Sequence, residues 1–349
     1  MAGPDQQWHT AALTVTLVLL VAVVFLAQQF ADNKPAASKP TTVMGTFHIN
    51  LQELEHPKLS TSLPSVLTHG MGDACSNPGF RQLTSLVATR TRSHAFCFSD
   101  GRDPMSDTIG GFAKPMQVQV DEFAKYVRSK PELAGGFNAI GLSQGNLIIR
   151  GYIAQSNDPP VQNYISIHGP HAGVSSVPQC NPTPGSSLTA DVCLKVDNLV
   201  GALVYTAAVQ NGLAQANFVR FPNRLDDYLA HCHFLPGLLD KAAEKPAVRK
   251  NFASLNRLAL VMAEFDTMLE PKETAQFGHH EAGGWDKVVL GVDSPFYEAT
   301  GLKDLDAKGK VTRASTVGNH LQFSQAELNG WIDRIFLGSD DAAAVSTAN

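Results

Sequence analysis

Short apolar runs alternate along most of the chain with segments in which apolar residues recur at helical intervals. The apolar runs predict strands at 64–67, 95–98, 137–140, 161–167, 257–265 and 310–317. Helical spacing predicts helices at 80–89, from 115 to 127 and at 147–153. The glycine-containing stretch 100–114 is predicted to be a loop. An alternation of strands and helices predicts an α/β fold, with a mostly parallel sheet covered by helices on both faces.

Residues 174–254 break this alternation with a cysteine-bearing loop, the apolar stretch Leu199–Val209, and turns rich in proline and histidine. We interpret them as a largely helical insertion, or cap, over the carboxyl edge of the sheet. Near the C-terminus, Ser324 and Glu327 form a capping box, which predicts a last helix. The folded domain is therefore predicted to span 46–338, followed by a flexible tail at 339–349.

The N-terminus carries an uncharged segment rich in leucine and valine at 11–27. We predict that residues 1–31 are a secretory signal peptide or a signal anchor. Residues 1–10 contain no lysine or arginine, and small residues for cleavage occur at Ala27 and Ala31, so both alternatives stay open. Residues 32–45 are predicted to be a linker. We expect entry into the secretory pathway, with membrane contact through the apolar segment if it is retained.

Composition and charge exclude some classes of protein. Hydrophobic residues make up 44% of the chain and charged residues 17%, which is typical of a folded enzyme and too apolar for a disordered chain. A formal net charge of −5 provides no basic surface, so nucleic acid is not an expected partner.

The chain contains five cysteines. Cys180 and Cys193 bracket a loop rich in proline, glycine and serine, and we predict a disulfide between them, which would stabilise the fold by roughly 2–3 kcal/mol. The alternative is two unpaired thiols. Cys75, Cys97 and Cys232 stay unassigned, and the odd total leaves at least one cysteine free or paired outside the chain.

One motif carries chemistry, the G-x-S-x-G sequence Gly141-Leu142-Ser143-Gln144-Gly145. A predicted strand precedes it and a predicted helix follows, which is the context in which this motif forms a sharp turn. Such a turn raises the serine hydroxyl above the end of the sheet, and glycines flank it because a Cβ there would clash. We predict that Ser143 is a nucleophile.

A serine hydroxyl needs a base to remove its proton, and the base needs a carboxylate to orient it. Of the seven histidines that follow Ser143, His320 is the best placed, in the turn between the last strand and the last helix. Asp266 ends a buried strand and is the leading acid, with Glu264 and Glu270 as rivals.

The remaining histidines form close pairs that lack the full spacing of a zinc site. We predict polar loop residues, and neither a metal nor another cofactor, at His168 and His171, at His231 and His233 with Cys232, and at His279 and His280. Glycines directly after the first strand, at 70 and 72, suit a loop whose backbone N–H groups point at a ligand oxygen. The alternative for that loop is a plain turn.

Three segments resemble the lysosomal palmitoyl-protein thioesterases, in order and over roughly 65–337. They are His69-Gly70-Met71-Gly72-Asp73-Ala74-Cys75-Ser76-Asn77-Pro78, Gly136-Phe137-Asn138-Ala139-Ile140-Gly141-Leu142-Ser143-Gln144-Gly145 and Gly318-Asn319-His320-Leu321-Gln322-Phe323-Ser324. The resemblance implies an α/β-hydrolase fold with Ser143 as nucleophile, Asp266 as orienting acid and His320 as base. It also implies an oxyanion hole made of the backbone N–H groups of Met71 and Gln144.

The chain also departs from the family pattern. Cys180 and Cys193 match a paired cysteine position, but Cys75 and Ser76 stand where the family has two adjacent cysteines, and a third family bridge lacks a clear counterpart. Residues 276–310 match loosely.

The resemblance implies hydrolysis of the thioester of S-palmitoylated cysteine in proteins or peptides, through a serine acyl-enzyme, in the lysosome or after secretion. One alternative is an oxyester hydrolase, a lipase or lysophospholipase, with the same machinery. The other is a non-catalytic, membrane-tethered lipid binder. Leu199–Val209 is a candidate lining for the acyl groove, with ordinary core as its alternative.

Overall fold

The computed structural model describes residues 62–99, 103–178, 180 and 188–339. The expected signal segment, the linker and all but the first residue of the expected tail lie outside these residues. None of the helices in the described part combines the length and the apolarity needed to cross a bilayer.

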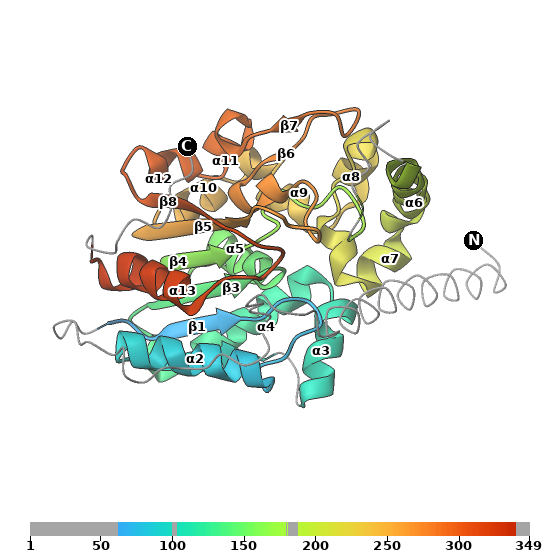
Figure 1. The fold of residues 1–349 in the computed structure, drawn as a ribbon. Helices are drawn as coiled ribbons and strands as arrows, with labels where there is room; N and C mark the ends of the chain where they lie inside the picture. Colours follow the sequence, from blue (N-terminus) through green and yellow to red (C-terminus); the bar gives the residue numbers. More distant parts are fainter. Residues whose placement is uncertain (1–61, 100–102, 179, 181–187, 340–349) are drawn as a thin grey trace.

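Six parallel strands form the central sheet, in the order β2-β1-β3-β4-β5-β8 (Figure 1). The strands are β1 Ser65–Thr68, β2 Ala95–Phe98, β3 Phe137–Leu142, β4 Val161–Ile167, β5 Arg257–Ala263 and β8 Val311–Thr316. Each lies within a few residues of a predicted run, so the predicted parallel α/β sheet is confirmed. A separate antiparallel pair consists of β6 His279–His280 and β7 Val288–Val289.

The register aligns the carboxyl ends of the strands. Thr68 pairs with Gly141, and Leu142 pairs with Ile167. On the other half of the sheet, Ala263 pairs with Thr316. The segments that follow β1, β3, β4, β5 and β8 therefore leave the sheet at one edge, where sites form in such folds.

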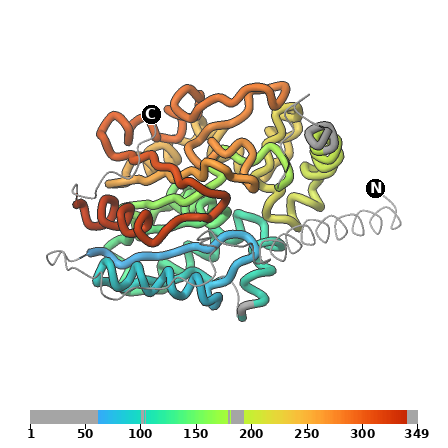
Figure 2. Tube along the Cα trace, in the orientation of Figure 1, coloured from blue at the N-terminus to red at the C-terminus, as the bar shows by residue number. Residues whose placement is uncertain are grey.

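Alternate residues of each central strand enter two separate cores, one on each face of the sheet. Ala139 and Tyr164 belong to the core under α4 Met116–Arg128 and α5 Gly145–Gln155. Ile140 and Ile165 belong to the core under α2 Pro78–Thr91 and α13 Gln325–Ile332. The blue α2 and the red α13 lie side by side although they come from opposite ends of the fold (Figure 2). Burial on both faces explains the continuous apolar runs of the sequence.

The predicted loop at 100–114 is wrong over most of its length, because α3 spans Pro104–Ala113. Asp103 caps the helix by accepting hydrogen bonds from the N–H groups of Met105 and Ser106, at 3.0 and 2.9 Å. The Ser106 hydroxyl in turn accepts from the Asp103 N–H at 3.1 Å, which completes a capping box. This capping outweighs the low helix propensity of the glycines near the C-terminus of α3.

Helices occupy most of the predicted insertion. They are α6 Leu188–Val204, α7 Ala207–Gly212, α8 Leu225–His231, α9 Leu235–Leu238 and α10 Pro246–Phe252, with 3₁₀ turns at Ala214–Phe218, Pro222–Arg224 and Ala242–Glu244. Figure 1 places α6, α7 and α8 beyond the carboxyl ends of the strands, as predicted. The stretch Leu199–Val209, the candidate lining of the acyl groove, contains both exposed and buried side chains: Leu199 is 67% exposed, whereas Val204 and Val209 are buried.

The remaining short elements lie outside the main sheet and the insertion. They are α11 Phe296–Ala299, α12 Leu302–Asp306, a π-helical turn at Asp333–Leu337, and 3₁₀ turns at Pro131–Leu133, Lys272–Gln276 and Gly291–Asp293.

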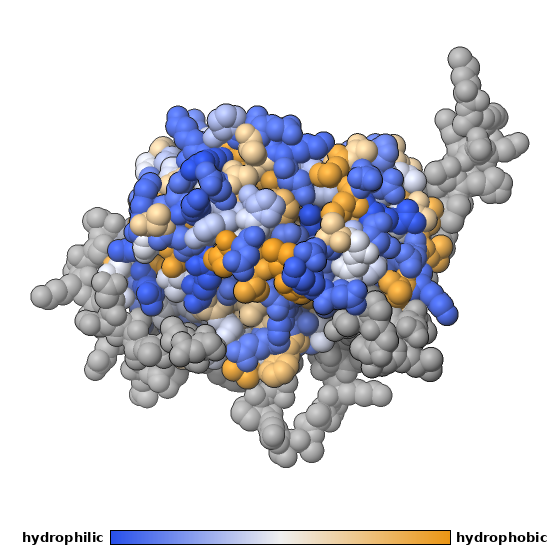
Figure 3. Space-filling model, turned by 90° about the horizontal axis from the view of Figure 1, so that it is seen from above, coloured by the Kyte–Doolittle hydropathy of each residue, from blue (hydrophilic) through white to orange (hydrophobic). Residues whose placement is uncertain are grey.

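Hydrophilic residues dominate the face of the molecule seen from above, with apolar groups between them (Figure 3). On the loops after β5 and β8, Phe265 is 65% exposed and Val317 is 80% exposed.

Two disulfides link the described cysteines. One joins Cys180 to Cys193, as predicted, and the other joins Cys75 to Cys97 on β2, which the sequence left open. Cys232 is a free thiol, and burial raises its pKa to about 11, so the thiol stays protonated at physiological pH.

Candidate active site

Ser143 lies in the sharp turn between β3 and α5. Its φ angle is 51°, in the left-handed region that non-glycine residues rarely adopt. The Ser143 N–H donates to the Ile167 carbonyl at 3.0 Å, and the Asn146 side-chain amide donates to the carbonyls of Ser143 and Ile167, each at 3.0 Å. These bonds hold the serine in its unusual backbone conformation.

The two glycines of the motif are required by close contacts. A Cβ atom on Gly141 would lie 2.3 Å from the Asn146 side-chain oxygen. A Cβ atom on Gly145 would lie 2.5 Å from the His69 carbonyl oxygen and 2.7 Å from that of Thr68. Gly145 therefore lets the segment after β1 pack directly against the start of α5.

We expect Gly145→Ala to lower the free energy of unfolding by about 1–3 kcal/mol, because two backbone oxygens would have to move. Activity should fall as well, since those oxygens precede the loop beside Ser143. Thermal denaturation together with hydrolysis rates tests this. Gly135→Ala is the matched control, because its added Cβ would meet nothing within 4 Å. Equal melting temperatures for the two variants would contradict the expected clash.

Ser143, His320 and Asp266 come together at the carboxyl edge of the sheet. His320 Nε2 lies 2.8 Å from Ser143 Oγ, and His320 Nδ1 lies 2.7 Å from Asp266 Oδ2. Because a carboxylate accepts but does not donate, Nδ1 carries the proton. Nε2 is then free to accept the proton of the serine hydroxyl.

The Asp266 side chain is only 1% exposed, yet its surroundings favour the charged form. Burial would raise the pKa of Asp266, but the attraction and hydrogen bond of His320 outweigh burial and hold that pKa below its ordinary value. The N–H groups of Met268 and Leu269 donate to Asp266 Oδ1 at 2.8 and 2.9 Å. The carboxylate is thus fixed with its other oxygen toward His320.

The rival carboxylates have other partners. Glu264 accepts a hydrogen bond from the Ser315 hydroxyl at 2.9 Å. Glu270 lies 2.8 Å from His280 Nε2, on the short β6 strand. Of the three candidate acids, all within the described residues, Asp266 alone contacts His320.

His168 is a fully buried neighbour of the site whose contribution the sequence did not indicate. Its Nδ1 accepts from the Leu321 N–H at 2.8 Å, and its Nε2 donates to Thr316 Oγ1 at 3.1 Å. Burial, with repulsion from His320, lowers the pKa of His168 to about 3, so the ring is neutral and Nδ1 can accept. His168 therefore ties the His320 loop to β4 and β8. One feature of the sequence could have indicated this role: the strand predicted at 161–167 ends directly before His168, at the same carboxyl edge of the sheet as Ser143.

The predicted oxyanion donors, Met71 and Gln144, flank the serine. A Cβ atom on Gly70 would lie 3.1 Å from Ser143 Cβ, so the glycine loop packs on the serine turn. Over the described residues, neither the Met71 N–H nor the Gln144 N–H donates to a protein acceptor. The Gln144 side chain is fixed separately, donating to the Gly111 carbonyl at 2.8 Å. Both N–H groups thus remain available to a ligand oxygen.

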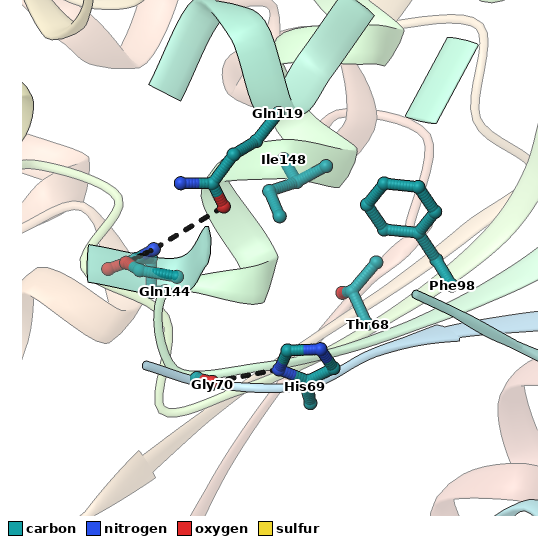
Figure 4. A pocket seen from close by; sticks show the side chains of 8 residues that line it. Thr68, His69, Gly70, Phe98, Gln119, Gln144 and Ile148 are labelled. Atoms are coloured by element: carbon teal, nitrogen blue, oxygen red, sulfur yellow. Dashed lines mark hydrogen bonds between the residues drawn. The ribbon is translucent and has the colours of Figure 1, made fainter. Parts of the chain in front are cut away.

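A small cavity lies beside the glycine loop (Figure 4). It is lined by Thr68, His69, Gly70, Phe98, Gly111, Gln119, Gln144 and Ile148. The lining mixes apolar and amide side chains, and no residue of Leu199–Val209 takes part in it.

In the described part of the chain, two groups of side chains come close enough to share a metal ion. One is His168, Asp266 and His320, whose ligand atoms already contact each other, Ser143 or neighbouring loops. The other contains Cys75, whose sulfur is in a disulfide. Of the histidines predicted to be polar loop residues, four are in fact buried: His168, His171, His279 and His280, the last two on β6. A fifth, His231, lies in α8. His171 Nε2 lies 2.7 Å from Ser166 Oγ.

Comparison with known proteins places these features in a family. The family model for palmitoyl protein thioesterase matches residues 64–320, a range that contains Ser143, Asp266 and His320. Palmitoyl-protein thioesterase 1 of Caenorhabditis elegans is 29% identical over 290 residues, which cover 81% of this chain and 95% of that protein. Lysosomal thioesterase PPT2 of Mus musculus is 27% identical over 268 residues, 73% of this chain and 80% of that protein.

A third relative is longer than this chain. The palmitoyl-protein thioesterase-dolichyl pyrophosphate phosphatase fusion 1 of Schizosaccharomyces pombe is 27% identical over 301 residues, which cover 84% of this chain. This chain spans about half of that relative, 47% of its length. Since the family model covers well over half of the residues, the chain belongs to the palmitoyl protein thioesterase family.

Proposed function

We propose that this chain hydrolyses the thioester bond of long-chain S-acylated cysteines in proteins or peptides, through an acyl-enzyme on Ser143. The observation that carries the proposal is the continuous chain of contacts from Ser143 Oγ to His320, at 2.8 Å, and from His320 to Asp266, at 2.7 Å. Membership of the thioesterase family supports the choice of substrate.

In the acylation step, Ser143 Oγ attacks the thioester carbonyl while His320 Nε2 takes the hydroxyl proton. Asp266 stabilises the imidazolium that forms. The developing oxyanion accepts hydrogen bonds from the Met71 and Gln144 N–H groups, each of which typically contributes about 3–4 kcal/mol to lowering such a barrier. The C–S bond then breaks, and the imidazolium of His320 gives its proton to the departing sulfur, which restores the neutral base. A thiol has a pKa of roughly 8.5, so the sulfur depends on this proton less than an amine would.

In the deacylation step, a water molecule takes the position of the leaving thiol. His320 removes a proton from this water, which attacks the acyl carbonyl, and the same two N–H groups stabilise the second oxyanion. His320 then returns the proton to Ser143 Oγ, so that the fatty acid leaves and the enzyme is restored.

Hydrolysis of a palmitoyl-thioester peptide and of a matched oxyester peptide tests the proposal. We expect the wild type to turn over the thioester with the higher kcat/KM, and Ser143→Ala to abolish that turnover. Ser156→Ala, at an exposed serine at the C-terminus of α5, is the control and should retain full activity. A higher kcat/KM for the oxyester would favour a lipase, and binding without turnover would favour a non-catalytic lipid binder.

We propose a lysosomal or secreted location. The two disulfides are typical of proteins that fold in an oxidising compartment, and the mouse relative is named as lysosomal. Membrane anchoring through residues 11–27 stays a prediction, because this segment lies outside the described residues. Mass spectrometry of the N-terminus of the protein secreted or retained by expressing cells distinguishes a cleaved signal peptide from an anchor.

A further inference from the structure

His69, next to the glycine loop, faces a hydrogen-bond acceptor with each ring nitrogen. Nδ1 lies 3.0 Å from the carbonyl oxygen of Gly70, a contact drawn in Figure 4. Nε2 lies 3.3 Å from Asp107 Oδ1. A carbonyl oxygen and a carboxylate accept and do not donate, so both contacts are attractive only when the ring carries a proton on both nitrogens. The geometry therefore favours a positively charged His69.

The surroundings of His69 support this charge. Asp107, from α3, has a side chain 3% exposed, and its other oxygen accepts from the Cys75 N–H at 3.0 Å, as expected of a carboxylate. Burial lowers the pKa of His69, but Asp107, the Gly70 carbonyl and Asp73 together raise it above its ordinary value. The group that faces the ring from α2 is the uncharged Phe80 side chain, at 5.9 Å between ring centroids.

The Gly70 carbonyl and the Met71 N–H belong to the same peptide group. Because that group is conjugated, a donor on its oxygen shifts electron density toward the oxygen and makes its N–H a stronger donor. The Met71 N–H is one of the two proposed oxyanion donors. A charged donor on the Gly70 carbonyl therefore acts directly on the group that stabilises the transition state.

We propose that protonated His69, held by Asp107, is a positioning residue that polarises the Gly70–Met71 peptide and strengthens the Met71 N–H as an oxyanion donor. This proposal rests on the proposed thioesterase function. It assigns a role to α3, which brings Asp107 to the loop. It also assigns a role to the Cys75–Cys97 disulfide, which fixes the end of the same loop to β2.

Asp107→Asn tests the proposal, because it removes the negative charge at nearly constant shape. An oxyanion donor contributes about 10²–10³-fold to kcat, and a coupled hydrogen bond changes by about 10–30%. We therefore expect kcat to fall about two- to eightfold with KM unchanged. Asp121→Asn, at an exposed carboxylate on α4, is the control and should leave kcat unchanged.

The pH profile separates this role from a merely structural one. His69 is charged below its pKa and loses its contribution as the pH rises through that pKa. Without Asp107 the pKa of His69 falls, so the alkaline limb of the kcat profile should move to lower pH. A wild-type kcat and an unshifted limb in Asp107→Asn would overturn the proposal, whereas a wild type without Ser143-dependent thioester turnover would overturn the proposed function instead.

A second measurement holds even if Asp107→Asn does not fold. In Ser143→Ala, with Asp107 intact, nitrogen-15 NMR of the histidine rings reports the protonation of His69 directly. We expect both ring nitrogens of His69 to stay protonated above pH 6.5, the ordinary pKa of histidine. A His69 ring that is already neutral below that pH would overturn the proposal.

Discussion

Replacement of His320 by alanine is expected to lower kcat for thioester hydrolysis by at least about 10⁴-fold. His320 Nε2 is 2.8 Å from Ser143 Oγ, and in the proposed mechanism the same nitrogen serves acylation and deacylation. Without it, no group accepts the hydroxyl proton in the first step or activates water in the second. Steady-state kinetics with a palmitoyl-thioester peptide measures the loss.

His233→Ala is the matched control, because His233 is an exposed histidine in the insertion. It should retain wild-type kcat, and both variants should keep the wild-type melting temperature to within a few degrees. A loss below about 100-fold in a folded His320→Ala protein would assign the base to another group.

Asp266→Asn is expected to lower kcat by about 10⁴-fold, through the wrong histidine tautomer. The N–H groups of Met268 and Leu269 require an acceptor at the Oδ1 position, so the asparagine must place its NH₂ group toward His320. His320 Nδ1 must then accept, which leaves the ring proton on Nε2, facing Ser143. A protonated Nε2 cannot take the hydroxyl proton.

Glu264→Gln and Glu270→Gln separate Asp266 from the two rival carboxylates. Both rivals have partners other than His320, so each variant should change kcat less than about tenfold. Kinetics of the three variants, with melting temperatures as a check on folding, decides between them. A larger loss for either glutamine variant than for Asp266→Asn would move the orienting role to that glutamate.

The sheet could be predicted from the sequence because its strands are buried on both faces. Ile140 and Ala139, adjacent in β3, enter opposite cores, so the run is apolar throughout and stands out from its surroundings. The turn at Ser143 could be predicted because its glycines avoid clashes with residues nearby in the sequence. A Cβ atom on Gly141, for example, would clash with Asn146, five residues later. Local constraints of this kind leave a local pattern.

Two of the parts that could not be predicted depend on contacts between distant residues. His168 meets Thr316, which follows it by 148 residues, and the Cys75–Cys97 bridge requires that β2 lie beside β1. The position of Asp107 could not be predicted either, because the glycines of α3 favour a loop while the cap at Asp103 favours a helix. The contact of His168 and the Cys75–Cys97 disulfide join segments far apart in the chain, which local periodicity does not report, whereas α3 depends on a local cap.

The acyl-groove prediction shows the same limit. The stretch Leu199–Val209 is apolar, but apolarity alone does not separate a groove from a core. Val204 and Val209 are buried in the main core, Leu199 is 67% exposed, and the cavity beside the glycine loop is lined by other residues.

The most direct test of the central claim is mass spectrometry of the enzyme quenched in acid during turnover of a palmitoyl thioester. Acid traps an ester-linked intermediate because His320, once protonated, can no longer activate water. We predict one palmitoyl group per chain, on the proteolytic peptide that contains Ser143, and none in Ser143→Ala. Turnover with no acyl group on that peptide, or turnover that survives in Ser143→Ala, would contradict the account.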